Sequence, residues 1–356
     1  MPWGVAEAKA LGLYDILISA GGNLPTHWDT YQGAERTGHR DLRATSTPKE
    51  PILACSHPGM QEACLSAAED AGAAVYRGVR VRGLSASPAP GPGAELEFET
   101  GGQSQRMTAR LMVGADGRDS SVRAWAAFPS RQDPDRNLVA GVLLEGLDIA
   151  DDAAHVWLEP QLGHFVLHFP QGKGVSRAYL CYAAGSLPRL GGRADLPRFL
   201  ENCVASGVPA GIYSEAKQVG PLATFSGATT WAERPYQNGV ALIDDAAANS
   251  DPTWGQGLAL SLRDARTLAD ALSASGDWDG AGNAYMEQRQ RYYPVVHTME
   301  DWFSTLLMDT GPEADALRAR VFPLWGRDRG RNPDTFMNGP GEPLDETARR
   351  RFFGED

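Results

Sequence analysis

The chain has few cysteines, no long apolar run and no basic, apolar leader, and each absence excludes a class of protein. Its 356 residues contain four scattered cysteines without Cys-x-x-Cys spacing, namely Cys55, Cys64, Cys181 and Cys203. That usage predicts a reducing compartment and no metal site. No run approaches the roughly 18 apolar residues of a membrane helix, and the first residues lack the pattern of a signal peptide. We therefore expect a cytoplasmic protein with no membrane partner.

The chain also has fewer basic residues than acidic residues. Lys and Arg number 33 against 45 Asp and Glu, which gives a formal net charge of -12. An acidic surface repels a phosphodiester backbone, so we expect no nucleic-acid partner. Two glycine motifs are absent from the sequence, the dinucleotide fingerprint Gly-x-Gly-x-x-Gly and the nucleophile elbow Gly-x-Ser-x-Gly.

Hydrophobic residues make up 42% of the chain, enough for two structural units or one large α/β body. Short apolar or alternating runs between 138 and 225 predict an antiparallel sheet inserted into an α/β body. The predicted parts are 1–130, 131–225 for the inserted sheet, and 226–356. Apolar residues at helical spacing predict helices over 3–20, 58–71, 196–205, 256–273 and 281–300. The last of these is expected to kink at Pro294, and a turn is expected over 85–94.

The stretch 239–257 reads as a buried strand, an acidic turn, a proline-stiffened loop and a glycine-rich helix start. Asp244 and Asp245 follow the strand at its carboxyl end, where α/β folds place ligand contacts. Gly255 and Gly257 allow a flat ring to approach the backbone, and free helix amides favour negative charge by about 0.3–1 kcal/mol. From the residues alone, a ligand site and an ordinary glycine-capped strand–turn–helix are about equally supported.

The stretch 110–123 supplies a second short strand that ends at an acid. Asp116 and Gly117 form a turn, and Ser120 is the expected N-cap of a short helix. Asp116 is a candidate acceptor for cofactor hydroxyls. Taken alone, this stretch fits an ordinary Asp-Gly turn better than a site, with Arg123 as a solvated charge.

Together the two stretches resemble paired motifs of the class A flavoprotein monooxygenases, the p-hydroxybenzoate hydroxylase-like group. Asp116-Gly117-x-x-Ser120-x-x-Arg123 is similar to their DG motif, and the stretch 243–257 is similar to their GD motif. The resemblance implies an FAD-binding, Rossmann-like α/β fold in which the inserted antiparallel sheet forms a substrate domain.

The resemblance also implies roles for individual residues. Asp245 would contact the ribityl chain of FAD, and Pro252 with the glycine-rich backbone after it would lie near the isoalloxazine ring. His57, at the start of the helix predicted over 58–71, stands where the family often has a ribityl-contacting side chain. The implied cofactor-binding residues are Asp116, Gly117, Asp245, Pro252, Gly255, Gln256, Gly257 and His57.

The implied activity is an FAD- and NAD(P)H-dependent monooxygenation of the kind found in secondary metabolism. NAD(P)H would reduce the flavin, and a hydrophobic aromatic or polycyclic small molecule would be hydroxylated or epoxidised. Because the cofactor carries the chemistry, no protein nucleophile is required. The expected assembly is a monomer or a homodimer.

Two departures from the family bear on cofactor binding. The family opens with a strand, Gly-x-Gly-x-x-Gly and a helix whose N-terminus holds the ADP half of FAD. This sequence resembles the family only from just after that unit, so the expected fold lacks its first βαβ unit. Asp244 stands where the family has a glycine, and a second charge beside the cofactor is expected to weaken FAD binding.

The candidate catalytic residues are His164 and His168, four residues apart on one predicted strand. Such a face can line a substrate cavity with a histidine that titrates near neutral pH. Surface or hydrogen-bonded sheet histidines are the commoner case, by about two to one.

Two alternatives to the monooxygenase remain open. A flavin-free derivative of the scaffold would act as a non-redox cyclase or isomerase, or as a small-molecule-binding protein. An inert truncated product would expose sheet edges and apolar surface, which predicts poor solubility.

Overall fold

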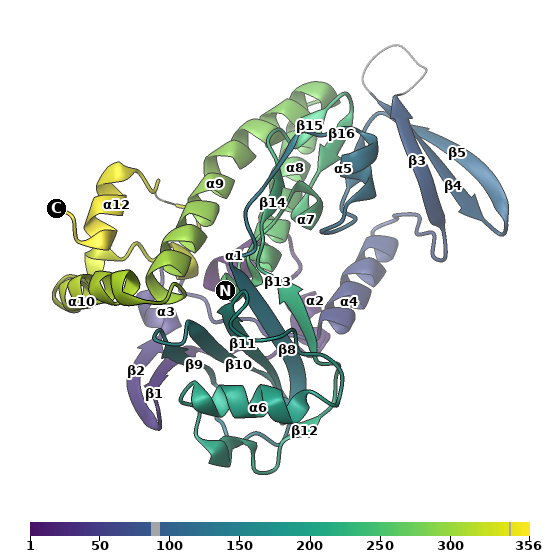
Figure 1. The fold of residues 1–356 in the computed structure, drawn as a ribbon. Helices are drawn as coiled ribbons and strands as arrows, with labels where there is room; N and C mark the ends of the chain where they lie inside the picture. Colours follow the sequence, from purple (N-terminus) through teal and green to yellow (C-terminus); the bar gives the residue numbers. More distant parts are fainter. Residues whose placement is uncertain (87–92, 342) are drawn as a thin grey trace.

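The computed structural model describes residues 1–86, 93–341 and 343–356, so most of the turn expected over 85–94 lies outside the described residues. Figure 1 shows an α/β part lying above a large sheet, with helices of the C-terminal region along one side. No helix in the described ranges is both long and apolar enough to span a bilayer.

The large sheet has eight strands in the order β12-β8-β11-β10-β9-β1-β2, with β13 also paired to β8. Strands β9, β10 and β11 form an antiparallel meander and β8 pairs antiparallel with β11, so the predicted antiparallel sheet is present, whereas β1 lies parallel to β9. Two of its strands, β1 and β2, come from the range expected for the first part of the chain. The strands are β1 (His27–Gln32), β2 (Glu35–Asp41), β8 (Asn137–Glu145), β9 (Ala153–Glu159), β10 (His164–Gly172), β11 (Val175–Ala183), β12 (Lys217–Gln218) and β13 (Ala223–Ser226).

The centre of the large sheet is covered on both faces, which explains why β8 and β10 are nearly continuous buried runs. Val166 packs in one cluster with Phe199 of helix α6 (Leu196–Ala205). Its neighbours Phe165 and Leu167 point to the opposite face and pack with residues of helix α9 (Trp278–Leu307). Because successive side chains of a strand alternate in direction, one strand contributes to both cores.

The α/β part is built on a small sheet with the order β15-β16-β6. Strands β6 (Met112–Gly114) and β16 (Val240–Leu242) are parallel, and β15 (Tyr236–Gln237) is antiparallel to β16. Helix α8 (Gly257–Ala274) packs between α9 and α1 (Pro2–Ala10). The other edge of β6 has no strand partner among the described residues, and the side chain of Val113 on that strand is 45% exposed.

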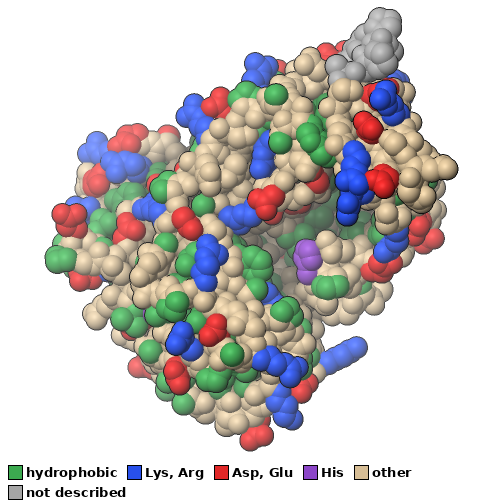
Figure 2. Space-filling model, turned by 45° about the vertical axis from the view of Figure 1, so that its right-hand side comes forward, with side chains coloured by type: hydrophobic (Ala, Val, Ile, Leu, Met, Phe, Trp, Pro, Cys, Tyr) green, Lys and Arg blue, Asp and Glu red, His purple; other side chains and the backbone are tan. Residues whose placement is uncertain are grey.

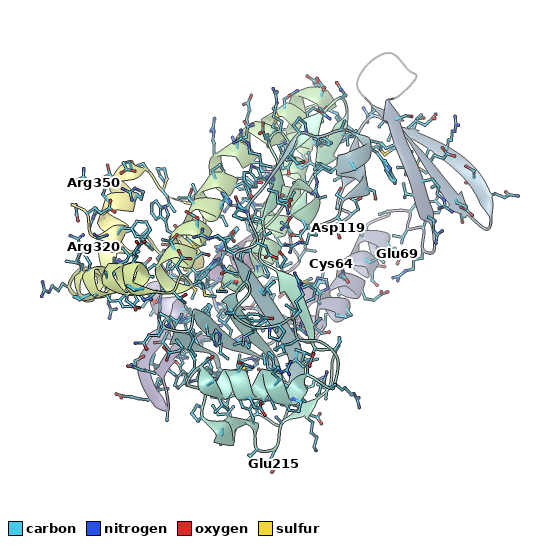
Figure 3. The ribbon with its side chains drawn as sticks, in the orientation of Figure 1. Cys64, Glu69, Asp119, Glu215, Arg320 and Arg350 are labelled. Atoms are coloured by element: carbon cyan, nitrogen blue, oxygen red, sulfur yellow. The ribbon has the colours of Figure 1, made fainter. Side chains whose placement is uncertain are left out.

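The remaining elements surround these two layers. Figure 3 marks Arg320 and Arg350 on helices of the C-terminal region and Glu215 at the lower end of the large sheet. The other strands are β3 (Arg80–Ala86), β4 (Ala94–Thr100), β5 (Gln103–Ala109), β7 (Ser130–Gln132), β14 (Thr230–Ala232) and β17 (Ala248–Asn249). The other helices are α2 (Tyr14–Ser19), α3 (Leu42–Thr45), α4 (His57–Asp70), α5 (Ser121–Trp125), α7 (Asp244–Ala247), α10 (Pro312–Arg327), α11 (Thr335–Asn338) and α12 (Glu346–Phe353). The 3-10 turns are η1 (Ala210–Tyr213), η2 (Pro252–Trp254) and η3 (Arg329–Arg331).

Helix α9 extends beyond the expected range of 281–300, because it begins at Trp278 and continues through Pro294 to Leu307. A proline inside a helix removes one backbone hydrogen bond and costs about 3 kcal/mol. Beyond the proline, Val296, Met299 and Trp302 are buried in the core cluster beside the large sheet. That burial is larger than the local cost, since each fully buried apolar side chain contributes about 1.5–3 kcal/mol.

Candidate cofactor site

Two parallel strands bring the two acidic motifs to one edge of the small sheet. Gly114 of β6 lies beside Leu242 of β16, and the amide of Ile243 donates to the carbonyl of Gly114 at 3.0 Å. Asp116 and Asp245 therefore follow neighbouring strand ends, where α/β sheets carry their ligand contacts.

Asp116 organises the turn that it begins. Its carboxylate accepts the hydroxyl of Ser120 and the amide of Val122. Ser120 accepts the amide of Arg123 at 2.9 Å, which confirms the predicted N-cap of α5. Gly117 has a φ of 81° with open space beside its Cα, so this turn conformation favours glycine. Asp116 is exposed, although both of its oxygens already hold the turn.

Arg123 ties the two motifs together, a role that the sequence did not reveal. One of its terminal nitrogens donates to the carbonyl of Ala246 at 2.9 Å, and the other donates to the carbonyl of Arg118 at 2.7 Å. Arg118 in turn donates to the carbonyl of Ala228. The expectation of a solvated Arg123 is corrected, because unpaired carbonyls on the neighbouring strand connection recruit its planar donor group.

Asp244 and Asp245 place two carboxyl groups side by side after β16. Asp244 has a φ of 58°, a left-handed conformation in which glycine is favoured and Asp is tolerated. Its carboxylate accepts the hydroxyl of Ser261, and its amide donates to Asp264 at 3.0 Å. Burial, and then the charge of Asp244, raise the pKa of Asp245 to about 6, against the opposing effect of Arg118 and Arg123.

The loop before α8 is rigid and buried. Asp251 accepts the amide of Thr253 at 2.9 Å and the side chain of Asn137 at 2.9 Å, which fixes the turn that Pro252 begins. Gly255 follows in a left-handed conformation with a φ of 60°. The expectation of a free Gly255 amide is corrected, because this amide donates to the carbonyl of Pro252 at 3.2 Å.

The helix amides that remain free belong to the next residues. Helix α8 begins at Gly257, and the backbone amides of Gly257 and Leu258 donate to no acceptor within the described parts of the chain. Unsatisfied amides at a helix start attract an anion or an oxygen acceptor. Gln256 is fully buried, and its side chain donates to the carbonyl of Trp254 and accepts the indole of Trp3. The side chain of Gln256 is therefore committed to contacts inside the protein.

His57 lies outside this hydrogen-bonded arrangement. It is the exposed first residue of α4, after the N-cap Ser56. Its predicted contact with a ribityl chain stays a prediction. Figure 2 shows the molecular face beside this region, where a hollow floored by hydrophobic side chains separates two bulkier parts of the surface.

His164 and His168 lie on one face of β10, as predicted, but that face is covered by α6 and η1. His164 contacts the hydroxyl of Ser206 at 2.8 Å, and His168 contacts the hydroxyl of Tyr213 at 2.9 Å. Burial lowers the pKa of His164 and brings the pKa of His168 to about 3. The expectation that this face offers a histidine titrating near neutral pH is therefore corrected, because α6 and η1 remove it from water.

Comparison with known proteins agrees with this geometry. Residues 9–291 match the family model described as "FAD binding domain". The chain is 30% identical over 230 residues to the digeranylgeranylglycerophospholipid reductase of Methanothrix thermoacetophila, covering 60% of this chain and 54% of that protein. It is 27% identical over 252 residues to the rifampicin monooxygenase of Streptomyces venezuelae, covering 69% of this chain and 50% of that protein. The chain thus spans about half the length of these curated relatives.

Solved structures show the same fold. The p-nitrophenol 4-monooxygenase PnpA from Pseudomonas putida has a TM-score of 0.76 at 16% identity, covering 96% of this chain and 88% of that chain. Klebsiella pneumoniae HpxO complexed with FAD has a TM-score of 0.68 at 19% identity, covering 100% of this chain and 88% of that chain. These likenesses confirm the expected α/β fold of FAD-binding type with an inserted antiparallel sheet. The division of the chain at 130 and 225 stays a prediction.

Proposed function

Because the chain belongs to the FAD-binding-domain family of the class A flavoprotein monooxygenases, we propose that it is an FAD-dependent monooxygenase that consumes NAD(P)H. We propose a hydrophobic aromatic or polycyclic small molecule as its substrate. The names of the structural relatives support this substrate class, since they include a p-nitrophenol monooxygenase and an anhydrotetracycline hydroxylase from Streptomyces rimosus. The observation that carries the proposal is the shared edge of β6 and β16, where Asp116 and Asp245 follow neighbouring strand ends and Arg123 joins the two motifs.

The residues at this edge fit the flavin and ribityl part of FAD. When bound, FAD would supply the redox chemistry, and the protein would supply placement and electrostatics. Asp245 offers a carboxyl group to sugar-alcohol hydroxyls. The free amides of Gly257 and Leu258 would donate to ring oxygens and favour negative charge there by about 0.3–1 kcal/mol. A Cβ on Gly257 would lie 3.3 Å from the hydroxyl of Ser250, so a larger residue at this position would crowd that side chain.

The fit is weaker for the ADP half of the cofactor. The sequence carries no Gly-x-Gly-x-x-Gly loop that would hold a diphosphate on a helix N-terminus. Asp244 adds a carboxylate to the same strand end, and its charge opposes an anionic cofactor. We therefore expect FAD to bind this chain weakly, with the flavin end held more firmly than the adenosine end.

The test is a titration of the purified 356-residue protein with FAD, followed by flavin absorbance and fluorescence. Asp245→Asn should weaken FAD binding about tenfold or more, because a hydrogen bond to a charged group contributes about 1.5–3 kcal/mol. Asp119→Asn, in the exposed turn before α5, is the matched control and should leave the affinity unchanged. An affinity that both variants leave unchanged, or a protein that takes up no FAD, contradicts the proposed site.

A second candidate is a flavin-dependent reduction without oxygen transfer, since the names of several curated relatives describe reductases. Oxygen uptake coupled to NAD(P)H oxidation supports the monooxygenase. Substrate-dependent NAD(P)H oxidation that proceeds without oxygen supports the reductase. A protein that stays colourless with added FAD but binds an aromatic ligand supports the flavin-free alternative.

A further inference from the structure

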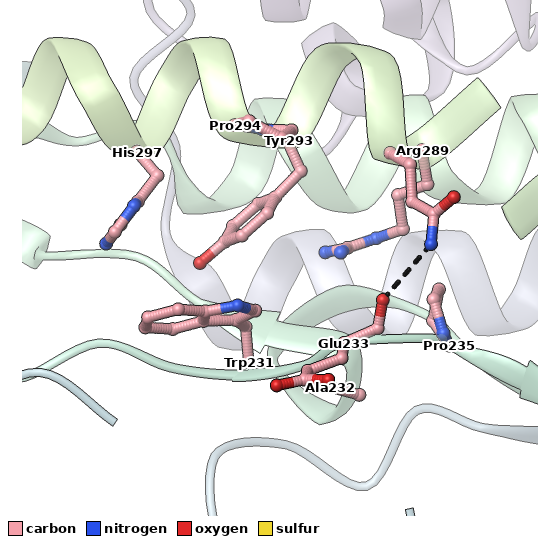
Figure 4. Close-up of a pocket in the computed structure, with 9 residues that line it drawn as sticks. Trp231, Ala232, Glu233, Pro235, Arg289, Tyr293, Pro294 and His297 are labelled. Atoms are coloured by element: carbon pink, nitrogen blue, oxygen red, sulfur yellow. Dashed lines mark hydrogen bonds between the residues drawn. The ribbon is translucent and has the colours of Figure 1, made fainter. Parts of the chain in front are cut away.

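A cavity of about 220 Å³ lies between α9 and the chain from β14 to β15, away from the acidic edge of the cofactor site. Figure 4 shows its aromatic and proline-rich walls. The ring centroids of Trp231 and His297 are 4.8 Å apart, and the rings of Tyr293 and His297 are stacked at 5.8 Å. Pro235 and Pro294 add further apolar surface. These walls suit a flat apolar molecule better than a sugar or an extended chain.

Two buried polar groups that line this cavity have no hydrogen-bond partner among residues 1–86, 93–341 and 343–356. They are Nη2 of Arg289 and the hydroxyl of Tyr293, on side chains that are 2% and 6% exposed. In Figure 4 both polar ends point toward the space above the ring of Trp231. A buried donor without a partner costs about 1–3 kcal/mol, so each group favours a ligand that brings an oxygen acceptor.

The charges around the cavity select among such ligands. Arg289 is paired with buried Asp264, and His297 contacts Asp133 at 2.7 Å. At the rim, Glu233 is paired with Arg131. Since Arg289 and Arg131 each already have a carboxylate partner, little net positive charge is left to attract an anion. A neutral acceptor oxygen therefore matches the cavity better than a carboxylate does.

We propose that this cavity is a second ligand site, which binds a small, neutral, planar aromatic molecule carrying a carbonyl oxygen. The ring stacks on Trp231, and the oxygen accepts hydrogen bonds from Tyr293 and Arg289. The site is linked to the cofactor edge through Asp264, which accepts Nε of Arg289 at 3.0 Å and the amide of Asp244 at 3.0 Å.

The test uses benzamide as the probe and the purified full chain without added FAD, so its result does not depend on the proposed redox function. Binding is measured by isothermal titration calorimetry and by saturation-transfer NMR. Tyr293→Phe should weaken benzamide binding by about five- to tenfold, which corresponds to one lost hydrogen bond. Trp231→Leu should weaken it at least as much through loss of the stacked ring.

The test includes a control variant, two control ligands and a check that each variant has folded. Tyr76→Phe changes an exposed tyrosine that is 66% accessible, and it should not alter the affinity. Benzoate and cyclohexanecarboxamide should each bind more weakly than benzamide, because one adds a charge and the other lacks a flat ring. An unfolding curve for each variant checks that it has folded. Benzamide binding that is absent, or unchanged in both cavity variants, overturns the proposal, and tighter binding of benzoate overturns the neutral-ligand assignment.

Discussion

At the scale of single residues, Asp244 combines an unfavourable backbone conformation with a negative charge beside the proposed cofactor site. Its φ of 58° is disfavoured for a residue with a side chain, and its charge helps to raise the pKa of Asp245 to about 6. A carboxyl group whose folded-state pKa is raised stabilises the fold at low pH. That contribution is lost as the pH rises through 6.

We expect Asp244→Gly to stabilise the protein relative to Asp244→Ala by about 1 kcal/mol, because only glycine adopts this backbone conformation without strain. Both variants remove the charge, so both should lower the pKa of Asp245 equally and strengthen FAD binding. Urea denaturation measures the first effect, and the pH profile of the FAD dissociation constant measures the second. Equal stability of the two variants would contradict the backbone argument.

At the scale of elements, α8 and α9 are joined by a buried ion pair. Asp264 is fully buried on α8 and accepts Arg289 of α9, the hydroxyl of Tyr292 and the amide of Asp244. Removing one partner of such a pair leaves a buried charge uncompensated, at a cost of about 3–5 kcal/mol. Asp264→Asn should therefore lower the free energy of unfolding by that amount in chemical denaturation.

The matched control for this prediction lies on the same helix. Asp270 pairs with Arg266 at 3.1 Å, and its side chain is 67% exposed. Water screens this pair, so Asp270→Asn should change the free energy of unfolding by less than about 1 kcal/mol. Similar losses in the two variants would show that the Asp264 pair does not stabilise the contact between α8 and α9.

The elements also show how far the sequence could predict the fold. Helix α6 coincides with the expected range of 196–205, because a regular apolar period survives in a well-packed core. The last runs of the region expected to form the inserted sheet give only the short strands β12 and β13, and Gly220-Pro221 lies between their pairings with β8. Helix α10 was not expected, since its sequence contains Pro323 and many charges.

The sequence predicted the position of the candidate site but not all of the contacts around it. The shared edge of Asp116 and Asp245 followed from their positions after buried strands, which local pattern can show. The bridge made by Arg123 and the contact of Tyr213 in η1 with His168 depend on residues far apart in sequence. Such contacts leave no periodic signal in the sequence. From sequence alone, the arginine is therefore predicted to be solvated, and the buried histidine is a candidate acid or base.

At the scale of the whole molecule, the packing of α6 and η1 onto the large sheet predicts a dependence of stability on pH. His168 is fully buried with a pKa of about 3, whereas the unfolded chain gives histidine its ordinary pKa near 6.5. Below pH 6.5, His168 binds a proton in the unfolded chain but stays neutral in the folded protein. The stability that His168 contributes is therefore complete above pH 6.5 and is lost as the pH falls toward 3.

Buried carboxyl groups such as Asp251 and Glu300, whose pKa values burial raises, oppose this trend, so a comparison of variants isolates the histidine. His168→Gln keeps an amide that can bond the hydroxyl of Tyr213 but cannot titrate. Relative to this variant, the native protein should lose up to about 1.4 kcal/mol per pH unit between pH 6 and pH 4, measured by urea denaturation. His57→Gln, at an exposed position, should parallel the native protein over the same range. A constant difference between native protein and His168→Gln would mean that His168 is protonated in the folded state, and that water reaches the interface between α6 and the sheet.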